Sequence, residues 1–515
     1  MRPRMDTAAA VDKVDRKKTY TLVISATGGL SSGLLIGLSF RYPQLALIAW
    51  FGLVPLLVAL HRSSFRAAVT SGAVFGAAMF GTIVYWFYIF GLPAVAGILL
   101  YGALFGVAFC VGTWWVLRRL PAPWRVTSVP ALLVVLEWLR SSGSWGFGWG
   151  VLGYTQQPIG AVAQFASVAG VLGISAALGL VNAVMAEIVV APRGRRRILT
   201  LSAVPLAVVG GLLAWGMARQ AATVGPPTVL IAGVQPSIDQ WAKFDPEQAA
   251  SVIRVLRRLS AEALESEPFL LIWPETAVPI AGEEARLFLD GAAREAQRAG
   301  ADFLYGAFES DGGGLKNSAV LVNARGERGT YGKVHLVPFG EYVPLRPLLG
   351  NVGMLTLVRV DLSAARRPVL LPSSFGPVAS VICFESTDAA LVRRAVNMGA
   401  GFLVVITNDG WFKETDASGQ HFRMTSMRAI ENGTYVAQVS NNGISGVIDP
   451  RGRVTAATRL WDRTVLRGSV GVGAEATPYR RYGDLPLLAL AALVLGLGAL
   501  PVFSAGSASN KTWSS

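Results

Sequence analysis

Residues 378–385 read VASVICFE, an apolar run that ends at a cysteine followed two positions later by a carboxylate. The run is typical of a buried strand, and a polar turn and a segment of helical spacing at Ala390–Met398 follow it. A turn between a strand and a helix can expose a nucleophile and offer it backbone N–H groups. The stretch therefore favours an α/β fold and makes Cys383 a candidate nucleophile.

The same alternation continues on both sides, over residues 220–480. These roughly 260 residues are enough for a single domain with its own core. Short β-branched runs alternate with segments of helical spacing, which favours an α/β layered fold. The strands that we predict are Val229–Val234, Phe269–Trp273, Phe303–Phe308, Ser318–Val322, Val378–Cys383, Phe402–Thr407, Tyr435–Val439 and Ile444–Asp449. The predicted helices are Glu247–Glu267, Glu283–Ala299, Ala390–Met398 and His421–Asn432.

The rest of the chain is strongly apolar. Of the 515 residues, 52% are hydrophobic and 15% are charged, whereas soluble chains carry about a quarter charged residues. A membrane-spanning helix needs roughly 20 mostly apolar residues. The runs that come near this length are 19–40, 44–60, 66–90, 94–117, 126–142, 162–190, 198–217 and 485–504. The sequence thus predicts a polytopic membrane protein of about eight transmembrane helices with one large domain outside the bilayer.

The positive charges orient these spans. The net charge is +14, and much of it lies in short loops beside apolar runs, where Lys and Arg mark the cytoplasmic side. This placement favours membrane orientation over nucleic-acid binding. The first apolar run is too long for a cleaved signal peptide and is expected to stay as an anchor. In a bacterium with two membranes we expect an inner-membrane protein with a cytoplasmic tail at 1–18, seven spans within 19–217, a periplasmic domain at 220–480, a last span at 485–504 and a disordered tail at 505–515.

Three side chains of the large domain could carry acyl-transfer chemistry. Glu275 lies in WPET, Lys333 in GKVH, and Cys383 ends the strand described above. A thiol attacks a carbonyl well only as thiolate, so it needs a nearby base or cation. Taken singly, each residue has an ordinary interpretation as an inert cysteine or a solvated charge. The second cysteine, Cys110, lies inside an apolar run and is expected to be a small core residue without a disulfide.

Together the three residues resemble the carbon–nitrogen hydrolase, or nitrilase, superfamily, which is marked by a Glu-Lys-Cys triad in this chain order. The match is stronger to its membrane-bound branch, the apolipoprotein N-acyltransferases. The segments that carry this resemblance are WPET at 273–276, KVHLVPFGEYVP at 333–344, CFE at 383–385 and TNDGWF at 407–412. For the large domain the resemblance implies an αββα sandwich.

The resemblance also implies a role for each matched residue. Cys383 would be the nucleophile and acyl carrier, and Glu275 would be the general base. Lys333, with the backbone N–H after Cys383, would stabilise the oxyanion. Supporting residues would be Glu341, which orients Lys333, Glu385, which holds the site, and Phe384, which stands where the family often has tyrosine.

Four residues are candidates for substrate binding. Trp241 resembles an aromatic residue that the family places near the substrate entrance, and Trp411 belongs to the matched TNDGWF segment. Glu137 and Arg140 lie with tryptophans near the expected outer interface. Charges at that depth are functional candidates, whereas tryptophan there is often only an anchor. We therefore expect head-group or acyl-chain contacts from these two charges.

The resemblance implies a ping-pong reaction without a cofactor or metal. An acyl chain would pass from a phospholipid, with phosphatidylethanolamine as the first candidate, to Cys383 as a thioester. The α-amine of a diacylated apolipoprotein would then accept it. Neither His335 nor His421 has a carboxylate or cysteine at ligand spacing beside it, so the sequence predicts no metal site. The enzyme is expected to be a monomer.

Two alternative functions use the same features differently. A membrane-tethered amidase would hydrolyse a small carbon–nitrogen substrate with the same triad, and a non-catalytic scaffold would only bind lipoproteins. The apolar segment 347–358 is either a buried core strand or a lid over acyl chains. Cys383→Ala would abolish lipid transfer, abolish small-amide hydrolysis or have no effect in the three cases.

Overall fold

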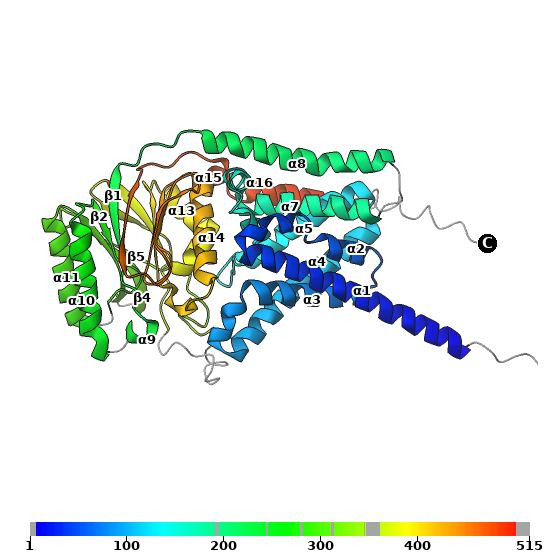
Figure 1. Cartoon of the computed structure of the whole chain (residues 1–515), viewed down its shortest axis with the longest axis horizontal. Coiled ribbons are helices and arrows are strands. Elements are labelled where there is room, and N and C mark those ends of the chain that lie inside the picture. The colour runs from blue at the N-terminus through cyan, green and yellow to red at the C-terminus, as the bar shows by residue number, and fades with distance from the viewer. Residues whose placement is uncertain are drawn as a thin grey trace, which may run out of the picture.

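The computed structural model describes residues 7–190, 195–243, 246–278, 282–310, 314–344, 346 and 361–500. The chain forms a helical bundle that adjoins an α/β domain (Figure 1). The bundle elements are α1 (Thr7–Arg41), η1 (Pro43–Trp50), α2 (Val54–His61), α3 (Phe65–Ile83), η2 (Tyr85–Phe90), α4 (Leu92–Arg119), α5 (Ala122–Ser141), η3 (Leu152–Gln156), α6 (Gly160–Ala163), α7 (Ala166–Val190), α8 (Arg195–Ala221) and α16 (Leu485–Ala499), where η denotes a 3₁₀ helix.

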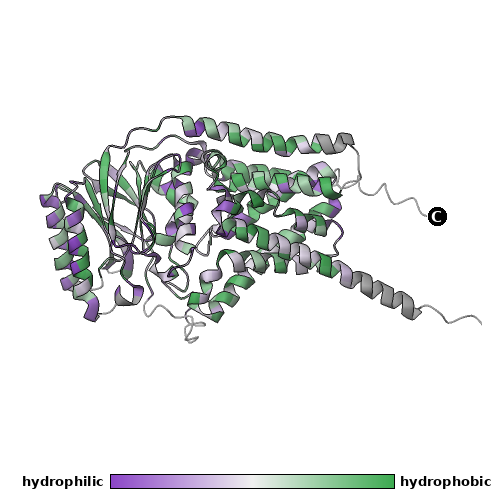
Figure 2. Cartoon of the chain, in the orientation of Figure 1, coloured by the Kyte–Doolittle hydropathy of each residue, from purple (hydrophilic) through white to green (hydrophobic). Residues whose placement is uncertain are grey.

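Five segments in the described ranges are long and apolar enough to cross a membrane. They are Thr19–Arg41, Pro43–His61, Leu92–Arg119, Ala166–Val190 and Thr200–Ala221. The other three expected spans coincide with α3, α5 and the shorter apolar helix α16. Figure 2 shows how strongly apolar residues dominate the bundle. The chain is therefore a membrane protein by the composition of its helices.

The expected span 44–60 is not one continuous α-helix. Its first half is the 3₁₀ helix η1, and α2 begins afterwards with a proline in its first turn. Proline lacks a backbone N–H and is pre-organised for a helix start, which explains the break at Pro55. The expected span 162–190 is also interrupted, because Ala169 and Gly170 have non-helical backbone angles inside α7.

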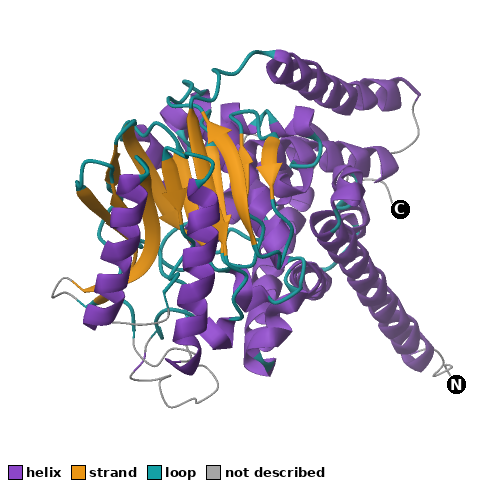
Figure 3. Ribbon diagram, turned by 60° about the vertical axis from the view of Figure 1, so that its left-hand side comes forward, coloured by secondary structure: helices purple, strands orange, loops and turns teal. Residues whose placement is uncertain are grey.

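The α/β domain contains two six-stranded sheets (Figure 3). The first has the order β12-β1-β2-β3-β4-β5 and the second β11-β10-β9-β8-β7-β6. The strands are β1 (Val229–Gln235), β2 (Leu270–Ile272), β3 (Asp302–Ser310), β4 (Leu315–Val322), β5 (Arg328–Gly332), β6 (Leu370–Ser373), β7 (Gly376–Ile382), β8 (Leu403–Thr407), β9 (Val436–Ser440), β10 (Gly446–Ile448), β11 (Val454–Ala457) and β12 (Thr464–Val470).

Helices cover the outer face of each sheet. One apolar core joins the two sheets to each other, and two further cores join the outer faces to helices. The helical elements of the domain are α9 (Gln240–Lys243), η4 (Pro246–Gln248), α10 (Ala249–Leu264), α11 (Gly282–Arg298), η5 (Cys383–Thr387), α13 (Ala389–Asn397), η6 (Asp409–Phe412), α14 (Ala417–Asn432) and α15 (Pro478–Tyr482). This is the layered α/β domain that the sequence predicts.

Helix α14 lies between the second sheet and the bundle (Figure 1). Gln420 accepts a hydrogen bond from the Trp149 indole at 2.6 Å and donates one to the Ile83 carbonyl at 3.0 Å. The Arg423 guanidinium donates to the Phe40 carbonyl at 3.1 Å. The catalytic half of the chain is thus bonded directly to the loops and helix ends of the bundle.

All eight predicted strands and all four predicted helices coincide with observed elements. Four strands were not predicted, namely β5, β6, β11 and β12. The segment 347–358 and the tail 505–515 lie outside the described residues, as does the very start of the predicted tail 1–18. Helix α1 already begins at Thr7, so most of that predicted tail is helical.

Candidate active site

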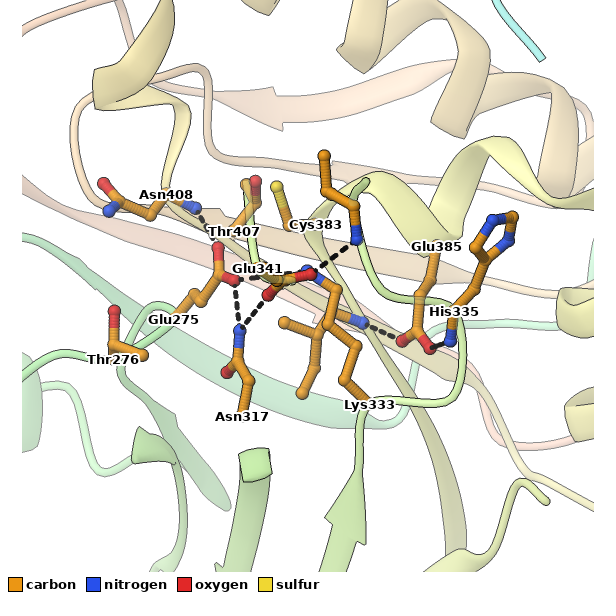
Figure 4. Close-up of polar contacts among 12 residues, drawn as sticks. Glu275, Thr276, Asn317, Lys333, His335, Glu341, Cys383, Glu385, Thr407 and Asn408 are labelled. Carbon is orange, nitrogen blue, oxygen red and sulfur yellow. Dashed lines mark hydrogen bonds and ion pairs between the residues drawn. The ribbon is translucent and has the colours of Figure 1, made fainter. Parts of the chain in front are cut away.

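The ends of four strands bring the predicted catalytic residues together. Lys333, Cys383 and Asn408 each follow a strand directly, and Glu275 lies three residues beyond β2. Parallel strands present their carboxyl ends at one edge of a sheet, where ligands commonly bind. Figure 4 shows the side chains of Glu275, Lys333 and Cys383 grouped around Glu341. The fold therefore assembles residues that are more than 100 positions apart in the chain (383 − 275 = 108).

The turn that carries Glu275 depends on a glycine. A Cβ atom at Gly306, on the neighbouring strand β3, would lie 2.6 Å from the Glu275 Cα and 2.6 Å from the Pro274 carbonyl oxygen. The next residue, Thr276, has a positive φ of 42°. Any larger residue at 306 would push this turn away from β3. The close approach fixes where the Glu275 carboxylate stands.

Cys383 occupies a strained position. Its φ is +54°, a region that non-glycine residues seldom adopt and that often marks functional sites. The side chain is only half-buried. Burial of the sulfur and the nearby charge of Glu275 raise the pKa of the thiol well above its usual range, while Lys333 acts in the opposite direction. The resting thiol is therefore neutral and needs a base at the moment of attack.

Glu275 is oriented by two hydrogen bonds and an ion pair. Its Oε1 accepts from the Asn317 side-chain amide at 2.6 Å and lies 3.6 Å from the Lys333 Nζ. Its Oε2 accepts from the backbone N–H of Asn408 at 2.8 Å. The carboxylate is buried, so these contacts replace water around it. A fixed carboxylate whose charge acts on a nearby thiol is a candidate general base.

Lys333 is a buried ammonium between two carboxylates. Its Nζ lies 2.9 Å from Glu341 Oε1 and 3.6 Å from Glu275 Oε1, and the side chain is 1% exposed. Burial alone lowers the pKa of Lys333, but the charges of Glu341 and Glu275 outweigh it and raise the pKa above its usual range. A permanently charged donor of this kind can stabilise an oxyanion that develops on a substrate.

Glu341 and Asn317 complete this network. The Asn317 amide donates to Glu341 Oε1 at 3.0 Å as well as to Glu275. The other oxygen of Glu341 accepts from the backbone N–H of Val337 at 2.8 Å. Glu341 therefore holds the Lys333 ammonium against the turn at Val337.

Glu385 joins the lysine loop to the nucleophile strand. Its Oε1 accepts from the backbone N–H groups of Val334 at 2.6 Å and His335 at 2.9 Å. Its Oε2 accepts from the Ile382 N–H and the Tyr331 hydroxyl, each at 2.8 Å. With four donors the fully buried carboxylate is satisfied. It fixes the distance between the oxyanion donor and the thiol.

Phe384 extends the site toward the bundle. Its ring stacks on Trp149 with a centroid distance of 6.2 Å and on Phe147 with 6.1 Å. Both partners belong to the loop that follows α5. On the other side the His335 ring meets Phe384 edge-on at 5.5 Å. An aromatic wall therefore runs from the nucleophile to the membrane part of the chain without needing a tyrosine hydroxyl.

Sequence reasoning missed three residues of the network. Asn317 and Asn408 hold Glu275, as described above. Lys243, which is fully buried, donates to the Glu275 carbonyl at 2.8 Å and to the Thr276 hydroxyl at 2.9 Å. Burial lowers the pKa of Lys243 to about 7, although the charges of Glu275 and Cys383 raise it. Asn408 lies in the matched TNDGWF segment but was not singled out there, whereas Asn317 and Lys243 lie in no motif with recognisable spacing.

The four predicted substrate-binding residues lie in different parts of the structure. Glu137 and Arg140 are buried on α5, where Glu137 accepts from the Leu152 N–H at 2.7 Å and Arg140 donates to the Phe147 and Trp149 carbonyls. Both therefore support the aromatic loop. Trp411 is half-buried on η6, close in the chain to Asn408. Trp241 lies on α9, and its side chain is outside the described part of the structure.

A cavity of about 690 Å³ lies between the bundle and the α/β domain. Cys383 does not line it, but the neighbouring loop and η5 do. Its lining includes Trp138, Tyr154, His335, Asp388 and Arg394. Within the ranges that the structure describes, no cluster of three or more His, Cys, Asp and Glu side chains could hold a metal ion. Beside this cavity the site offers a thiol, a buried carboxylate and a buried ammonium, which are groups suited to nucleophilic, acid–base and oxyanion chemistry.

Both halves of the chain match families of known proteins. Residues 32–184 match the family model of the apolipoprotein N-acyltransferase N-terminal domain, and residues 230–477 match that of carbon–nitrogen hydrolases. The chain is 34% identical over 479 residues to the apolipoprotein N-acyltransferase of Geobacter metallireducens, covering 88% of this chain and 91% of that one. It is 32% identical over 489 residues to the enzyme of the same name from Methylococcus capsulatus, covering 91% and 94%.

Among solved structures the chain is similar to a mutant of the Nesterenkonia AN1 amidase from the nitrilase superfamily. The identity is 20%, and the match covers 52% of this chain and 98% of that chain with a TM-score of 0.38.

Proposed function

This chain belongs to the apolipoprotein N-acyltransferase family, and on that premise we propose that Cys383, Glu275 and Lys333 carry its acyl transfer. The observation that supports this assignment is the contact set of the site. A half-buried neutral thiol lies at a strained turn, a buried carboxylate with fixed orientation lies near it, and a permanent ammonium lies 3.6 Å from that carboxylate. These are the parts that thioester chemistry requires.

The first half-reaction forms the thioester. The Cys383 sulfur attacks an ester carbonyl of a phospholipid while the Glu275 carboxylate takes the thiol proton. The negative charge that develops on the carbonyl oxygen is stabilised by the Lys333 ammonium and the backbone N–H of Phe384. When the tetrahedral species collapses, the glycerol oxygen leaves and takes the proton from Glu275. The products are an S-acyl enzyme and a lysophospholipid.

The second half-reaction transfers the acyl chain to nitrogen. The α-amine of the diacylglyceryl cysteine of an apolipoprotein attacks the thioester, and Glu275 takes a proton from the nitrogen. The Cys383 sulfur leaves and is protonated by Glu275, so the enzyme returns to its starting form. Because a thioester also reacts with water, the site must exclude it. The wall of Phe384, Phe147 and Trp149 supports such exclusion.

We assign the donor to phosphatidylethanolamine, the acceptor to a diacylated apolipoprotein, and the working enzyme to a monomer. Eight spans would place residues 1–18 in the cytoplasm and 220–480 in the periplasm of a bacterial inner membrane, with seven spans in 19–217, the eighth at 485–504 and a tail at 505–515. The basic loops between the helices support this orientation. Labelling of single cysteines in those loops by a membrane-impermeant thiol reagent tests it, since only periplasmic positions should react in intact cells with a permeabilised outer membrane.

The assignment of Cys383 is tested by intact-mass spectrometry after incubation with phosphatidylethanolamine. We expect an added acyl mass on the wild type that hydroxylamine removes and that a diacylated lipopeptide discharges. Cys383→Ala should lose the adduct, whereas Cys110→Ala should keep it, because Cys110 is fully buried in the bundle. Absence of an adduct, together with hydrolysis of small amides that depends on Cys383, would support a membrane-tethered amidase instead.

A further inference from the structure

A buried imidazole lies directly behind the nucleophile and has no part in the reaction described so far. His421, on α14, is 1% exposed. Its Nε2 lies 3.1 Å from the carbonyl oxygen of Cys383 and 2.8 Å from the Ser386 hydroxyl. Its Nδ1 lies 3.1 Å from Asp409 Oδ1. The ring therefore connects a buried carboxylate to the main chain of the nucleophile.

The contacts resemble a Ser-His-Asp catalytic triad, but burial excludes that role. Ser386 is 0% exposed and Asp409 is 1% exposed, so no substrate carbonyl can reach the serine hydroxyl. That hydroxyl also accepts a hydrogen bond from Thr425 at 2.9 Å. The reactive side chain at this turn is the half-buried Cys383. His421 acts on it through the backbone.

The partners of the ring determine where its protons lie. A backbone carbonyl can only accept a hydrogen bond, so the contact between Nε2 and the Cys383 oxygen is a hydrogen bond in the tautomer that carries a proton on Nε2. The Nδ1 atom faces a carboxylate oxygen, which also accepts the hydroxyl proton of Thr407 at 2.8 Å. Asp409 thus fixes the ring through Nδ1, and Nε2 is left facing the Cys383 carbonyl. A ring without the Nε2 proton would set two lone pairs against each other at 3.1 Å.

The carbonyl of Cys383 and the N–H of Phe384 belong to one peptide group. That group is planar and trans, so its C=O and N–H bonds point in opposite directions. Holding the carbonyl therefore aims the N–H, and a donor on the oxygen also polarises the N–H through the conjugated amide. This peptide group lies at the start of the short 3₁₀ helix η5, directly after the residue with the unusual φ of +54°.

We propose that His421 is a positioning residue that aims and polarises the Phe384 N–H as an oxyanion donor by hydrogen bonding to the carbonyl of Cys383. The inference rests on the proposed function, because the N–H is a donor only if Cys383 attacks a carbonyl. Asp409 holds the His421 ring in the required orientation. The direct donors to the oxyanion remain Lys333 and the N–H itself.

Two amide substitutions at position 421 separate the contacts of the ring. In His421→Gln the amide nitrogen falls near the Nε2 position and can still donate to the Cys383 carbonyl. In His421→Asn it falls near Nδ1, so it keeps Asp409 and loses Cys383. Removing a direct oxyanion donor typically lowers the rate about 10²–10³-fold; for the indirect contact we expect roughly a 10-fold to 100-fold loss of acylation in His421→Asn. His421→Gln should stay within about 3-fold of the wild type.

Two reactions of the Cys383 thiol show whether a lower acylation rate comes from weaker stabilisation of the oxyanion. Acylation by phosphatidylethanolamine and by a p-nitrophenyl acyl ester passes through an oxyanion, whereas alkylation by iodoacetamide does not. The acylation rate should fall in His421→Asn while the alkylation rate stays unchanged. A matched control is His61→Gln, because His61 also pairs with a buried carboxylate, Glu187, at 3.0 Å but lies in the bundle.

Several results would overturn the proposal. Equal losses of acylation and alkylation would show a purely structural role, and unchanged acylation in His421→Asn would show none. The chain has only three histidines, so ¹⁵N-histidine spectra of the wild type can be assigned by substitution, and an Nε2 atom without a proton would also contradict it. Acylation by the p-nitrophenyl ester alone would reject the phospholipid donor yet still decide the role of His421. If neither ester acylated the protein, both the proposed function and the role of His421 would be rejected.

Discussion

At the level of single residues, the active thiol is controlled by its protonation. Burial and the charge of Glu275 keep Cys383 neutral, and the charge of Lys333 only partly opposes them. A neutral buried thiol resists oxidation and stray electrophiles better than a standing thiolate does. In the proposed mechanism the thiolate therefore forms only when Glu275 takes the proton, which couples bond formation to proton transfer.

This coupling predicts opposite effects of one substitution on two reactions. In Glu275→Gln the base is lost, and acyl transfer should fall about 10²–10⁴-fold. The negative charge that raises the thiol pKa is lost as well. The midpoint of the pH profile for alkylation of Cys383 by iodoacetamide should therefore move to lower pH. Peptide mass spectrometry after timed alkylation measures this midpoint in the wild type and in Glu275→Gln.

A matched control for this experiment is Glu283→Gln, since Glu283 lies exposed at the start of α11. It should change neither the acylation rate nor the alkylation profile. If the midpoint for Glu275→Gln stayed in place or rose, Glu275 would not be the charge that holds the thiol neutral.

The sequence could predict the residues that sit in continuous motifs and no others. Cys383 and Glu385 are adjacent to a recognisable strand, and Lys333 and Glu341 share one twelve-residue segment. Lys243 and the two asparagines reach Glu275 from α9, β4 and the end of β8. Asn408 does lie in the TNDGWF segment, but nothing in that segment indicates that its backbone N–H binds Glu275. Asn317 and Lys243 lie in no quoted motif, and all three contacts arise only when separate strands come together.

At the level of elements, the same distinction holds. The predicted strands are those with continuous β-branched or apolar runs, such as β8 with the burial of all five of its residues. The missed strands are partly exposed: β11 has no buried residue, β5 contains two glycines, and β6 contains a proline. Edge and half-exposed strands have weak sequence patterns because the pairing, and not the burial, defines them.

At the kink in α7, Gly170 packs closely against α15, and this contact predicts the effect of a substitution on stability. Gly170 has φ +65°, and a Cβ atom there would lie 2.5 Å from a ring carbon of Tyr479 on α15. Gly170→Ala therefore combines backbone strain with overpacking and should lower the free energy of unfolding by roughly 2–4 kcal/mol. Thermal unfolding in detergent, followed by tryptophan fluorescence, measures this change.

Gly210→Ala is the control variant for Gly170→Ala. Gly210 lies within α8, and a Cβ atom there would meet nothing within 4 Å. Alanine favours a helix over glycine, so this variant should unfold at the same temperature or slightly higher. Equal destabilisation of both variants would show that the contact with Tyr479 does not matter.

At the level of the whole molecule, α14 makes the bundle and the catalytic domain one unit. Arg428 and Glu431 are fully buried on this helix, with Nη2 and Oε1 3.1 Å apart. Arg428 also donates to the Tyr154 hydroxyl at 2.9 Å, and Glu431 accepts from the Val171 N–H at 3.0 Å. Both outside partners belong to the bundle. The pair therefore ties the domain that holds Cys383 to the helices that hold the aromatic wall.

A buried pair of this kind predicts a result that depends on which partner remains. Glu431→Gln keeps an acceptor for Val171 but leaves the Arg428 charge uncompensated, which should cost about 3–5 kcal/mol of stability. Arg428→Met in the same chain removes the stranded charge and should recover most of that loss.

The exposed pair of Arg328 and Glu309, at 2.8 Å, serves as a control, because Glu309→Gln should cost only about 0–1 kcal/mol. Chemical unfolding in detergent measures all three, and limited proteolysis between α8 and β1 reports whether the domain has come away from the bundle. If the double variant were no more stable than Glu431→Gln alone, the loss would come from the hydrogen bonds of Glu431 and not from an unpaired buried charge.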